Sequence, residues 1–149
     1  MTEAELIEYV KPYFKQRGYR KKNKRWIKVD GDFTINFFIQ GSCYDKDKYY
    51  IRPGIYLNAV TTDDFYGHFM AEIAQESPEQ VIRDFEVFCN NWANKEYIKK
   101  TLQEFMAWES RNPIEKRRAG LCDYDKDPPP SGACFGIPLK VKNYILENF

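Results

Sequence analysis

The sequence predicts an α+β fold: an N-terminal helix, an antiparallel meander of three or more strands, then a helical C-terminal half packed on the sheet. Apolar residues recur at helical spacing near the N-terminus. Residues 33–40 alternate between apolar and mostly polar side chains, as in a strand with one covered face. Helical spacing returns after Ser77. The length of 149 residues predicts a single domain, residues 1–149.

The first helix has recognisable start and stop signals. Thr2 and Glu5 have the spacing of a capping box, and Gly18 can end the helix in a left-handed conformation. A cationic run over residues 17–25 follows. Its simpler interpretation is a solvated turn whose cations complement the helix dipole. A contact with phosphate or with an acidic partner is the alternative.

Three strands are predicted next, over Trp26–Val29, Phe33–Gln40 and about Lys48–Ala59. Asp30-Gly31 is a hairpin turn signal between the first two. Pro53-Gly54 interrupts the third, which predicts an edge position or a bulge there.

The rest of the chain reads mainly as helices. Residues 61–76 are predicted to hold a short helix capped by Asp63-Asp64 and carrying Phe65, Phe69 and Ile73. Ser77-Pro78-Glu79-Gln80 is a stronger helix start, Asn94 can cap a further helix, and Pro138 can start the last one. The Pro-rich residues 122–136 are predicted to form a loop.

The second face of the predicted sheet is the candidate binding site. The first face, with Phe33, Ile35, Phe37 and Ile39, should face helices. Aromatic and polar side chains gather on the second, as on many recognition surfaces. Its members are Trp26, Asn36, Phe38, Gln40, Tyr50, Arg52, Tyr56 and Asn58. Trp26 and Lys28 belong to it only in one strand register. The alternative is that the last helices cover this face as a second core layer.

Catalytic and metal-binding patterns are absent from the sequence. It has no G-x-S-x-G, P-loop or dinucleotide-binding motif, and its four cysteines lack zinc-site spacing. The one histidine, His68, is expected to be structural. Asp123, Asp125 and Asp127 begin like a calcium loop, but Pro128 takes the required glycine position. The sequence therefore predicts no enzyme, metal or cofactor. An undetected enzyme, with His68 or a cysteine in a cleft, is a remaining alternative.

Charge and hydropathy bear on partners and location. Lys and Arg number 23 against 22 Asp and Glu, so net charge gives no attraction to nucleic acid. A nucleic-acid-binding domain that uses the basic turn 17–25 and the sheet aromatics is the second hypothesis. The acidic N-terminus lacks a signal-peptide core, and no apolar run nears 18 residues. The expectation is a cytoplasmic monomer or weak homodimer with no membrane contact.

Short motifs in the first third carry a family resemblance. They are Val10-Lys11-Pro12, Gly18-Tyr19-Arg20-Lys21-Lys22, Trp26, Gln40-Gly41-Ser42 and Gly54-Ile55-Tyr56. Over roughly residues 6–60 they resemble the bacterial domain-of-unknown-function family numbered 4304. The resemblance implies no activity and no catalytic residues. Small bacterial proteins of this type are often encoded beside toxins, so the candidate function by analogy is a toxin-immunity inhibitor with a toxin-like protein partner. The near-zero net charge departs from the strongly acidic inhibitors of basic nucleases.

Overall fold

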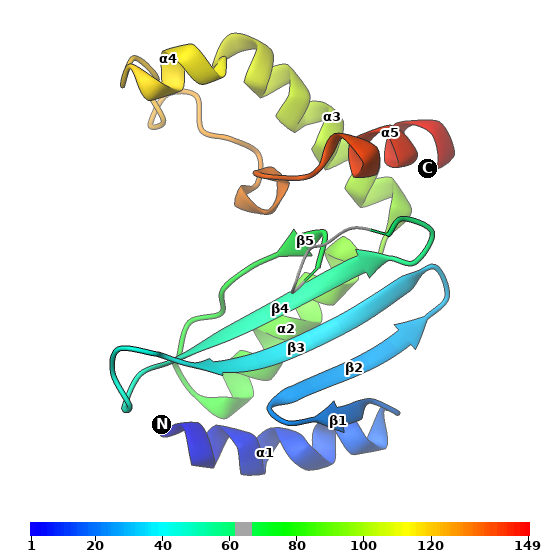
Figure 1. The fold of residues 1–149 in the computed structure, drawn as a ribbon, viewed down its shortest axis with the longest axis vertical. Helices are drawn as coiled ribbons and strands as arrows, with labels where there is room; N and C mark the ends of the chain where they lie inside the picture. Colours follow the sequence, from blue (N-terminus) through cyan, green and yellow to red (C-terminus); the bar gives the residue numbers. More distant parts are fainter. Residues whose placement is uncertain (62–66) are drawn as a thin grey trace. The chain divides into compact units, whose positions relative to one another are not determined.

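The computed structural model describes residues 1–61 and 67–149. The chain divides into two compact units, Met1–Ala93 and Asn94–Phe149, which are described separately (Figure 1). That the two units form one domain stays a prediction.

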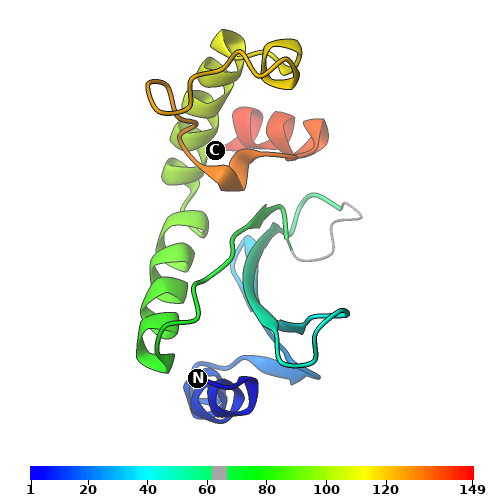
Figure 2. The ribbon, with the colours of Figure 1, turned by 90° about the vertical axis from the view of Figure 1, so that its left-hand side faces the viewer.

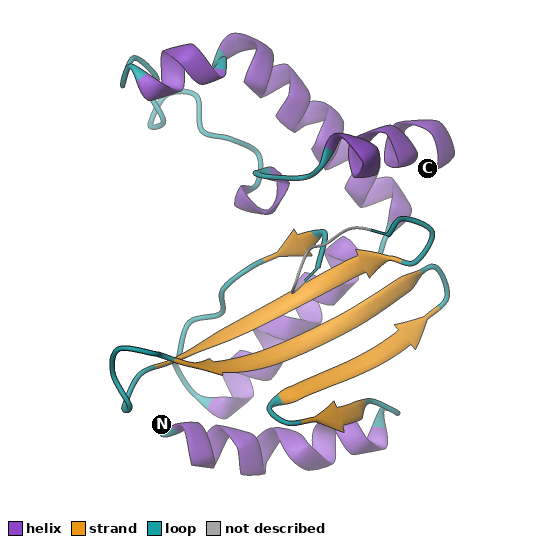
Figure 3. Cartoon of the chain, viewed as in Figure 1, coloured by secondary structure: helices purple, strands orange, loops and turns teal. Residues whose placement is uncertain are grey.

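The first unit is an antiparallel meander with two helices. Its elements in chain order are α1 (Glu3–Gln16), β1 (Arg20–Lys22), β2 (Arg25–Asp30), β3 (Phe33–Gly41), β4 (Tyr49–Leu57), β5 (Phe69–Met70) and α2 (Pro78–Trp92). The strands lie side by side in the order β1-β2-β3-β4-β5, and each pairs antiparallel with the next (Figure 3). The predicted α+β meander is confirmed. It has five strands, whereas the bounds of three were predicted from the sequence.

The helix α1 begins and ends as its sequence predicts. The Thr2 hydroxyl accepts the Glu5 N–H at 3.1 Å, and a Glu5 carboxylate oxygen accepts the Thr2 N–H at 2.8 Å. This reciprocal capping box satisfies two of the donors that a helix start leaves open. After the helix, Gly18 has a φ of +79°, which reverses the chain into β1.

Strand β4 corrects the prediction of an edge or bulge at Pro53. It lies between β3 and β5, and its register with β3 is unbroken. The Pro53 carbonyl accepts the Ala71 N–H at 3.3 Å, on the side away from β3. A residue in an antiparallel ladder directs both its backbone groups to one neighbour. The missing N–H of Pro53 therefore falls on the β5 side and leaves the β3 ladder intact.

The helix predicted over residues 61–76 is wrong for the described part of that segment. Phe69 and Met70 form β5, and Ile73 makes a bridge to Ile51 on the same side of β4. The proposed cap, Asp63-Asp64, lies outside the described residues.

An aromatic cluster forms the core of the first unit. Phe37 of β3 packs against Phe14 of α1 and Phe85 of α2, with ring centroids 4.9 and 5.1 Å apart. Trp26 of β2 stacks on Phe14 at 5.3 Å. All four side chains are buried. Both helices therefore pack on the sheet face that carries Phe37, and α2 runs along it in Figure 2.

The second unit is helical. It contains α3 (Lys95–Arg111), α4 (Ile114–Arg118), the 3₁₀ turn η1 (Gly132–Cys134) and α5 (Leu139–Asn148). The Asn94 side chain caps α3 by accepting the Tyr97 N–H at 3.1 Å. Its buried apolar residues include Ile98, Leu102, Phe105, Trp108, Val141 and Ile145. Among the helices of the described residues, none is long and apolar enough to cross a membrane.

Candidate functional site

The strand register brings most of the predicted site residues onto one sheet face. Phe38 lies opposite Arg52, Gln40 opposite Tyr50, and Thr34 opposite Tyr56. On the other side of β3, Arg25 lies opposite Phe38. We define the outer sheet face by the residues that share this side, namely Arg25, Ile27, Thr34, Asn36, Phe38, Gln40, Tyr50, Arg52, Tyr56 and Met70. It is the face opposite the aromatic core.

Trp26 does not belong to the outer sheet face. It pairs with Phe37, so it points into the core, where it is 2% exposed. Lys28 pairs with Ile35 and lies on the same side. Because neighbours across a sheet share a face, this register excludes Trp26 from any binding surface on the other side. The predicted membership of Trp26 is corrected accordingly.

Asn58 is committed to a turn. Its side-chain amide donates to the Gly31 carbonyl at 3.0 Å, and its side-chain oxygen accepts the Thr34 hydroxyl at 2.6 Å. Its own N–H donates to the Asp32 carbonyl at 2.9 Å. These three bonds fasten the β2–β3 turn to the end of β4. Its predicted role in binding stays a prediction.

Arg52 is held in place at the centre of the outer sheet face. It donates to the Gln40 side-chain oxygen at 2.5 Å and forms an ion pair with Glu72 at 3.5 Å. Its guanidinium lies over the Tyr50 ring, 4.8 Å from the centroid. These three contacts, from three chain segments, already restrict the rotamers of Arg52. Binding a partner would therefore cost less side-chain entropy.

A second cation lies over an aromatic ring on the same face. The Arg25 guanidinium is 4.8 Å from the centroid of the Phe38 ring. Both side chains are half-buried, as are Tyr50, Arg52 and Tyr56. Cation–π pairs of this kind hold an aromatic ring and a charge side by side at a surface. The face can therefore offer apolar contact and positive charge together.

A pocket opens at the β4–β5 side of this face. It has a volume of about 290 Å³ and is lined by Arg52, Met70, Ala71 and Glu72. The Met70 side chain is 43% exposed. Thioether side chains adapt their shape to a partner, which suits a pocket that receives an apolar group beside a charge.

Close backbone packing shapes the middle of the face. Gly54 of β4 lies opposite Asn36, which is only 2% exposed. Gly67 lies directly against this part of β4, since a Cβ on Gly67 would be 2.6 Å from the Ile55 nitrogen. Only glycine permits such an approach. Asn36 is thus buried although it lies on this face, whereas Phe38, Tyr50 and Arg52 are half-buried and more accessible.

His68 has a structural bond inside the first unit. It is 4% exposed, and its Nδ1 accepts the Leu57 N–H at 3.0 Å. Its ring meets the Tyr56 ring edge-on at 5.4 Å. An imidazole nitrogen that accepts a backbone N–H is not available to take a substrate proton. This geometry agrees with the structural role expected for His68.

Two of the four cysteines, Cys89 and Cys134, lack the features of an activated nucleophile. All four are free thiols. Burial, aided by Glu86, raises the pKa of Cys89 to about 12, and burial raises the pKa of Cys134 to about 11. Thiols with such pKa values hold almost no thiolate at neutral pH, and the thiolate is the reactive form.

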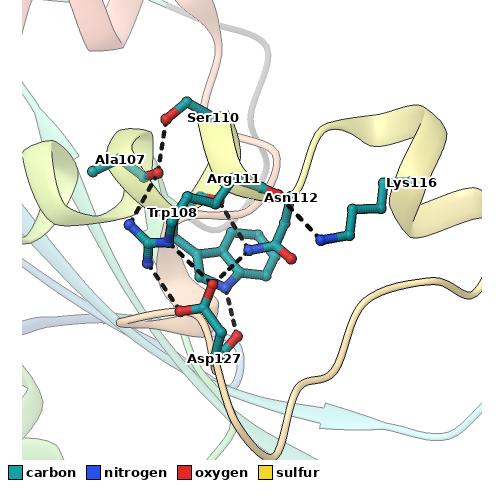
Figure 4. A network of polar contacts seen from close by, with 7 residues as sticks. All are labelled: Ala107, Trp108, Ser110, Arg111, Asn112, Lys116 and Asp127. Atoms are coloured by element: carbon teal, nitrogen blue, oxygen red, sulfur yellow. Dashed lines mark hydrogen bonds and ion pairs between the residues drawn. The ribbon is translucent and has the colours of Figure 1, made fainter.

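Asp127, the last of the three aspartates with calcium-loop spacing, is a tether within the second unit (Figure 4). Arg111 donates to both carboxylate oxygens of Asp127, at 3.1 and 2.9 Å, and the Asn112 side chain donates to one of them at 2.9 Å. The buried Trp108 ring donates to the Asp127 carbonyl at 2.8 Å. These bonds, with Arg111 first, lower the pKa of Asp127. Asp123 accepts the N–H groups of Asp125 and Lys126, as in a turn. The network fastens the Pro-rich loop to the end of α3.

Sequence reasoning missed the cations that β1 and β2 bring to the outer sheet face. Lys22 pairs with Arg25, and Arg20 pairs with Ile27, so these side chains share its side. Arg20, Lys21 and Lys22 are all cationic and all exposed, so the run carries no period-two pattern that would distinguish a strand from a solvated turn. The prediction of a turn over the whole basic run is corrected: residues 20–22 form strand β1.

A family model described as "Domain of unknown function (DUF4304)" matches residues 10–118. The match extends beyond the first-third resemblance and covers the sheet, α2, α3 and α4. Comparisons with curated proteins and with solved structures find no match.

Proposed function

The chain belongs to the DUF4304 family, whose function is unknown, and from this premise we propose that it is a non-enzymatic binding protein that takes a protein partner on its outer sheet face. In this proposal the protein is a bacterial cytoplasmic monomer or weak homodimer. A toxin-like product of a neighbouring gene is the candidate partner.

The observation that supports the proposal most is the pairing of rings with fixed guanidinium groups. Arg25 lies over Phe38 and Arg52 over Tyr50, and these two pairs are adjacent because Phe38 and Arg52 are cross-strand neighbours. Aromatic residues and arginine dominate the energetics of protein interfaces. Because these rings are half-buried, they offer apolar contact area to a partner, and the free protein does not expose a large apolar patch there.

The charges on this face suggest the chemistry of the partner. Arg25 and Arg52 are both cationic, and Arg20 and Lys22 extend the same side toward the sheet edge. Glu72 is an acidic residue beside this face, where it forms the ion pair with Arg52. Complementary potentials speed association and select partners. We therefore expect an acidic partner surface that carries an apolar group for the pocket beside Met70.

The non-enzymatic part of the proposal rests on the groups that could do chemistry. His68 has Nδ1 occupied by the Leu57 N–H, and the thiols of Cys89 and Cys134 have raised pKa values. A nucleophile–base pair needs both groups free and within hydrogen-bond reach. These side chains are better explained as packing and structural groups.

The test uses the purified products of the genes on either side, each titrated against this protein by calorimetry. Phe38→Ala removes one ring of the outer sheet face, and loss of an interface anchor worth about 2 kcal/mol weakens binding by about 30-fold. Tyr9→Ala is the matched control, because Tyr9 is an aromatic side chain on α1 that is 41% exposed. The control should bind like the unmodified protein.

Two results would contradict the proposal. Equal affinities of the Phe38→Ala variant and the unmodified protein would remove the outer sheet face as the binding surface. Turnover of a substrate by the purified protein that is lost in His68→Gln, with the fold retained, would restore the enzyme hypothesis.

A further inference from the structure

We propose that the sheet edge at β1, together with the lysines of α1, forms a site for a chain of phosphate groups. Residues 9–29 contain nine Lys and Arg and no Asp or Glu. The whole chain has 23 basic and 22 acidic residues, so this is a strong local excess in a nearly neutral protein. Local charge of one sign attracts polyanions even when net charge does not.

The fold concentrates these cations around one strand. Strand β1 is at the sheet edge, and all three of its residues are exposed. Its alternation sends Arg20 and Lys22 to the outer side and Lys21 to the opposite side. Lys11 and Lys15, four residues apart on α1, meet Lys21 at a shared pocket.

Two pockets flank β1 and have Lys21 in common. One is about 320 Å³ and is lined by Arg20, Lys21, Lys22 and Ile27. The other is about 260 Å³ and is lined by Lys11, Lys15, Tyr19, Lys21 and Trp26. An extended polyanion can place successive charges in both, with Lys21 between them. Lysine ammonium groups act on phosphate as mobile point charges, so they suit a flexible chain of phosphates.

Four of the five cations that line the two pockets have no ion-pair partner among the described carboxylates. Lys11 forms an ion pair with Glu8 at 2.5 Å, and Lys24 forms one with Glu3. Lys11, and to a smaller extent Lys21, lowers the pKa of Glu8. No described carboxylate lies within ion-pair distance of the other four cations that line the two pockets: Lys15, Arg20, Lys21 and Lys22.

Protection of the sheet edge alone explains less of this pattern. Lysines on an edge strand discourage pairing with a second chain. That purpose accounts for β1 but not for Lys11 and Lys15, which α1 contributes to the same pocket. The convergence of two elements on one cavity favours a ligand. The phosphate site does not include the aromatic pairs of the outer sheet face, but it shares Lys22 with that side of the sheet.

The experiment has two ligand arms, a labelled 12-nucleotide oligouridylate and inorganic polyphosphate of equal charge, because a phosphate chain can come from either source. Binding is measured from about 50 to 200 mM salt. One phosphate contact for each of Lys15, Arg20, Lys21 and Lys22 predicts a slope of about −2.8 in log affinity against log salt. This is a loss of about 50-fold over that range. Arg20→Gln/Lys21→Gln/Lys22→Gln should leave one contact, a slope of about −0.7 and a loss of about 3-fold.

The matched control removes three other exposed cations of the first unit, in Lys46→Gln/Lys48→Gln/Arg83→Gln. It should keep the slope of the unmodified protein, and circular dichroism should show that both triple variants are folded. Binding in either arm with these slopes supports the site and identifies the source of the phosphates. Binding in neither arm, or equal weakening by both triple variants, would overturn it.

Discussion

Replacing Phe37 and Phe38 by alanine, one at a time, should separate the structural face of the sheet from the binding face. The two residues are neighbours in β3 and have the same side chain, but the strand sends them to opposite sides. Phe37 is fully buried, with the rings of Phe14, Trp26 and Phe85 around it. Phe38 is half-buried.

The expected losses follow from these environments. Truncation of a buried phenylalanine leaves a cavity and costs about 3–5 kcal/mol. Full burial of such a side chain is worth about 1.5–3 kcal/mol, so half of it, with the cation–π contact to Arg25, gives about 1–2 kcal/mol for Phe38→Ala. With a urea dependence of about 2 kcal/mol per M, the midpoint should fall by about 2 M for Phe37→Ala and by about 0.5–1 M for Phe38→Ala.

Urea unfolding followed by tryptophan fluorescence measures this difference. A Trp108→Phe background, common to all samples, leaves Trp26 and Trp92 as the reporters, and both belong to the first unit. Only Phe38→Ala should then weaken partner binding under conditions where both variants are folded. Equal midpoint shifts, or a larger shift for Phe38→Ala, would refute the assignment of the two faces.

Two further substitutions test the backbone approach and the loop tether. Gly67→Ala places a Cβ against backbone atoms, 2.6 Å from the Ile55 nitrogen, and should cost about 1–3 kcal/mol in a thermal melt. Gly41→Ala is its control and should change stability by less than about 0.5 kcal/mol; equal losses would contradict the close packing. Asp127→Asn should lower the melting temperature at neutral pH, because the pKa of Asp127 is lowered from 3.8 by Arg111 and then by Asn112. A lowered carboxyl pKa gives stability above the unfolded-state pKa that is lost as pH falls through the folded-state pKa, so the two melting curves should converge below about pH 4. A gap that stays constant into acid would exclude this origin.

Local signals in the sequence predicted the fold well because they act over short distances. The capping box of Thr2 and Glu5, the Asn94 cap and the period-two pattern of β3 all appear in the structure. The segment around β5 failed for a physical reason. Phe69 and Ile73 are four residues apart, a spacing that fits one face of a helix and also one face of a strand. The pairing of this segment with β4 makes it a strand rather than a helix, and sequence spacing alone does not show such a pairing with a distant segment.

The site could be predicted only where the sequence shows which residues of a strand, odd-numbered or even-numbered, face the core. We call this the parity of the strand. A two-residue turn between β2 and β3 pairs even-numbered residues of one strand with odd-numbered residues of the other, whichever two residues form the turn. The turn is Gly31-Asp32, so Asp30 pairs with Phe33 and Trp26 with Phe37. The Asp30-Gly31 signal implied the same parity and would already have placed Trp26 in the core. For β4 no such argument exists, because seven residues separate it from β3. Its apolar alternation set the face instead.

The same parity joins two features that look separate in the sequence. By moving Trp26 into the core it brings Arg25 to the outer sheet face, and β1 then adds Lys22 beside Arg25. A single row crosses four strands as Lys22, Arg25, Phe38 and Arg52. Lys22 therefore borders both proposed surfaces, whereas Lys21 points to the other side and borders only the phosphate site. Lys21→Gln should weaken phosphate binding without changing affinity for a protein partner, and Lys22→Gln should weaken both. A Lys21→Gln variant that lost the protein partner would mean that the two surfaces are one.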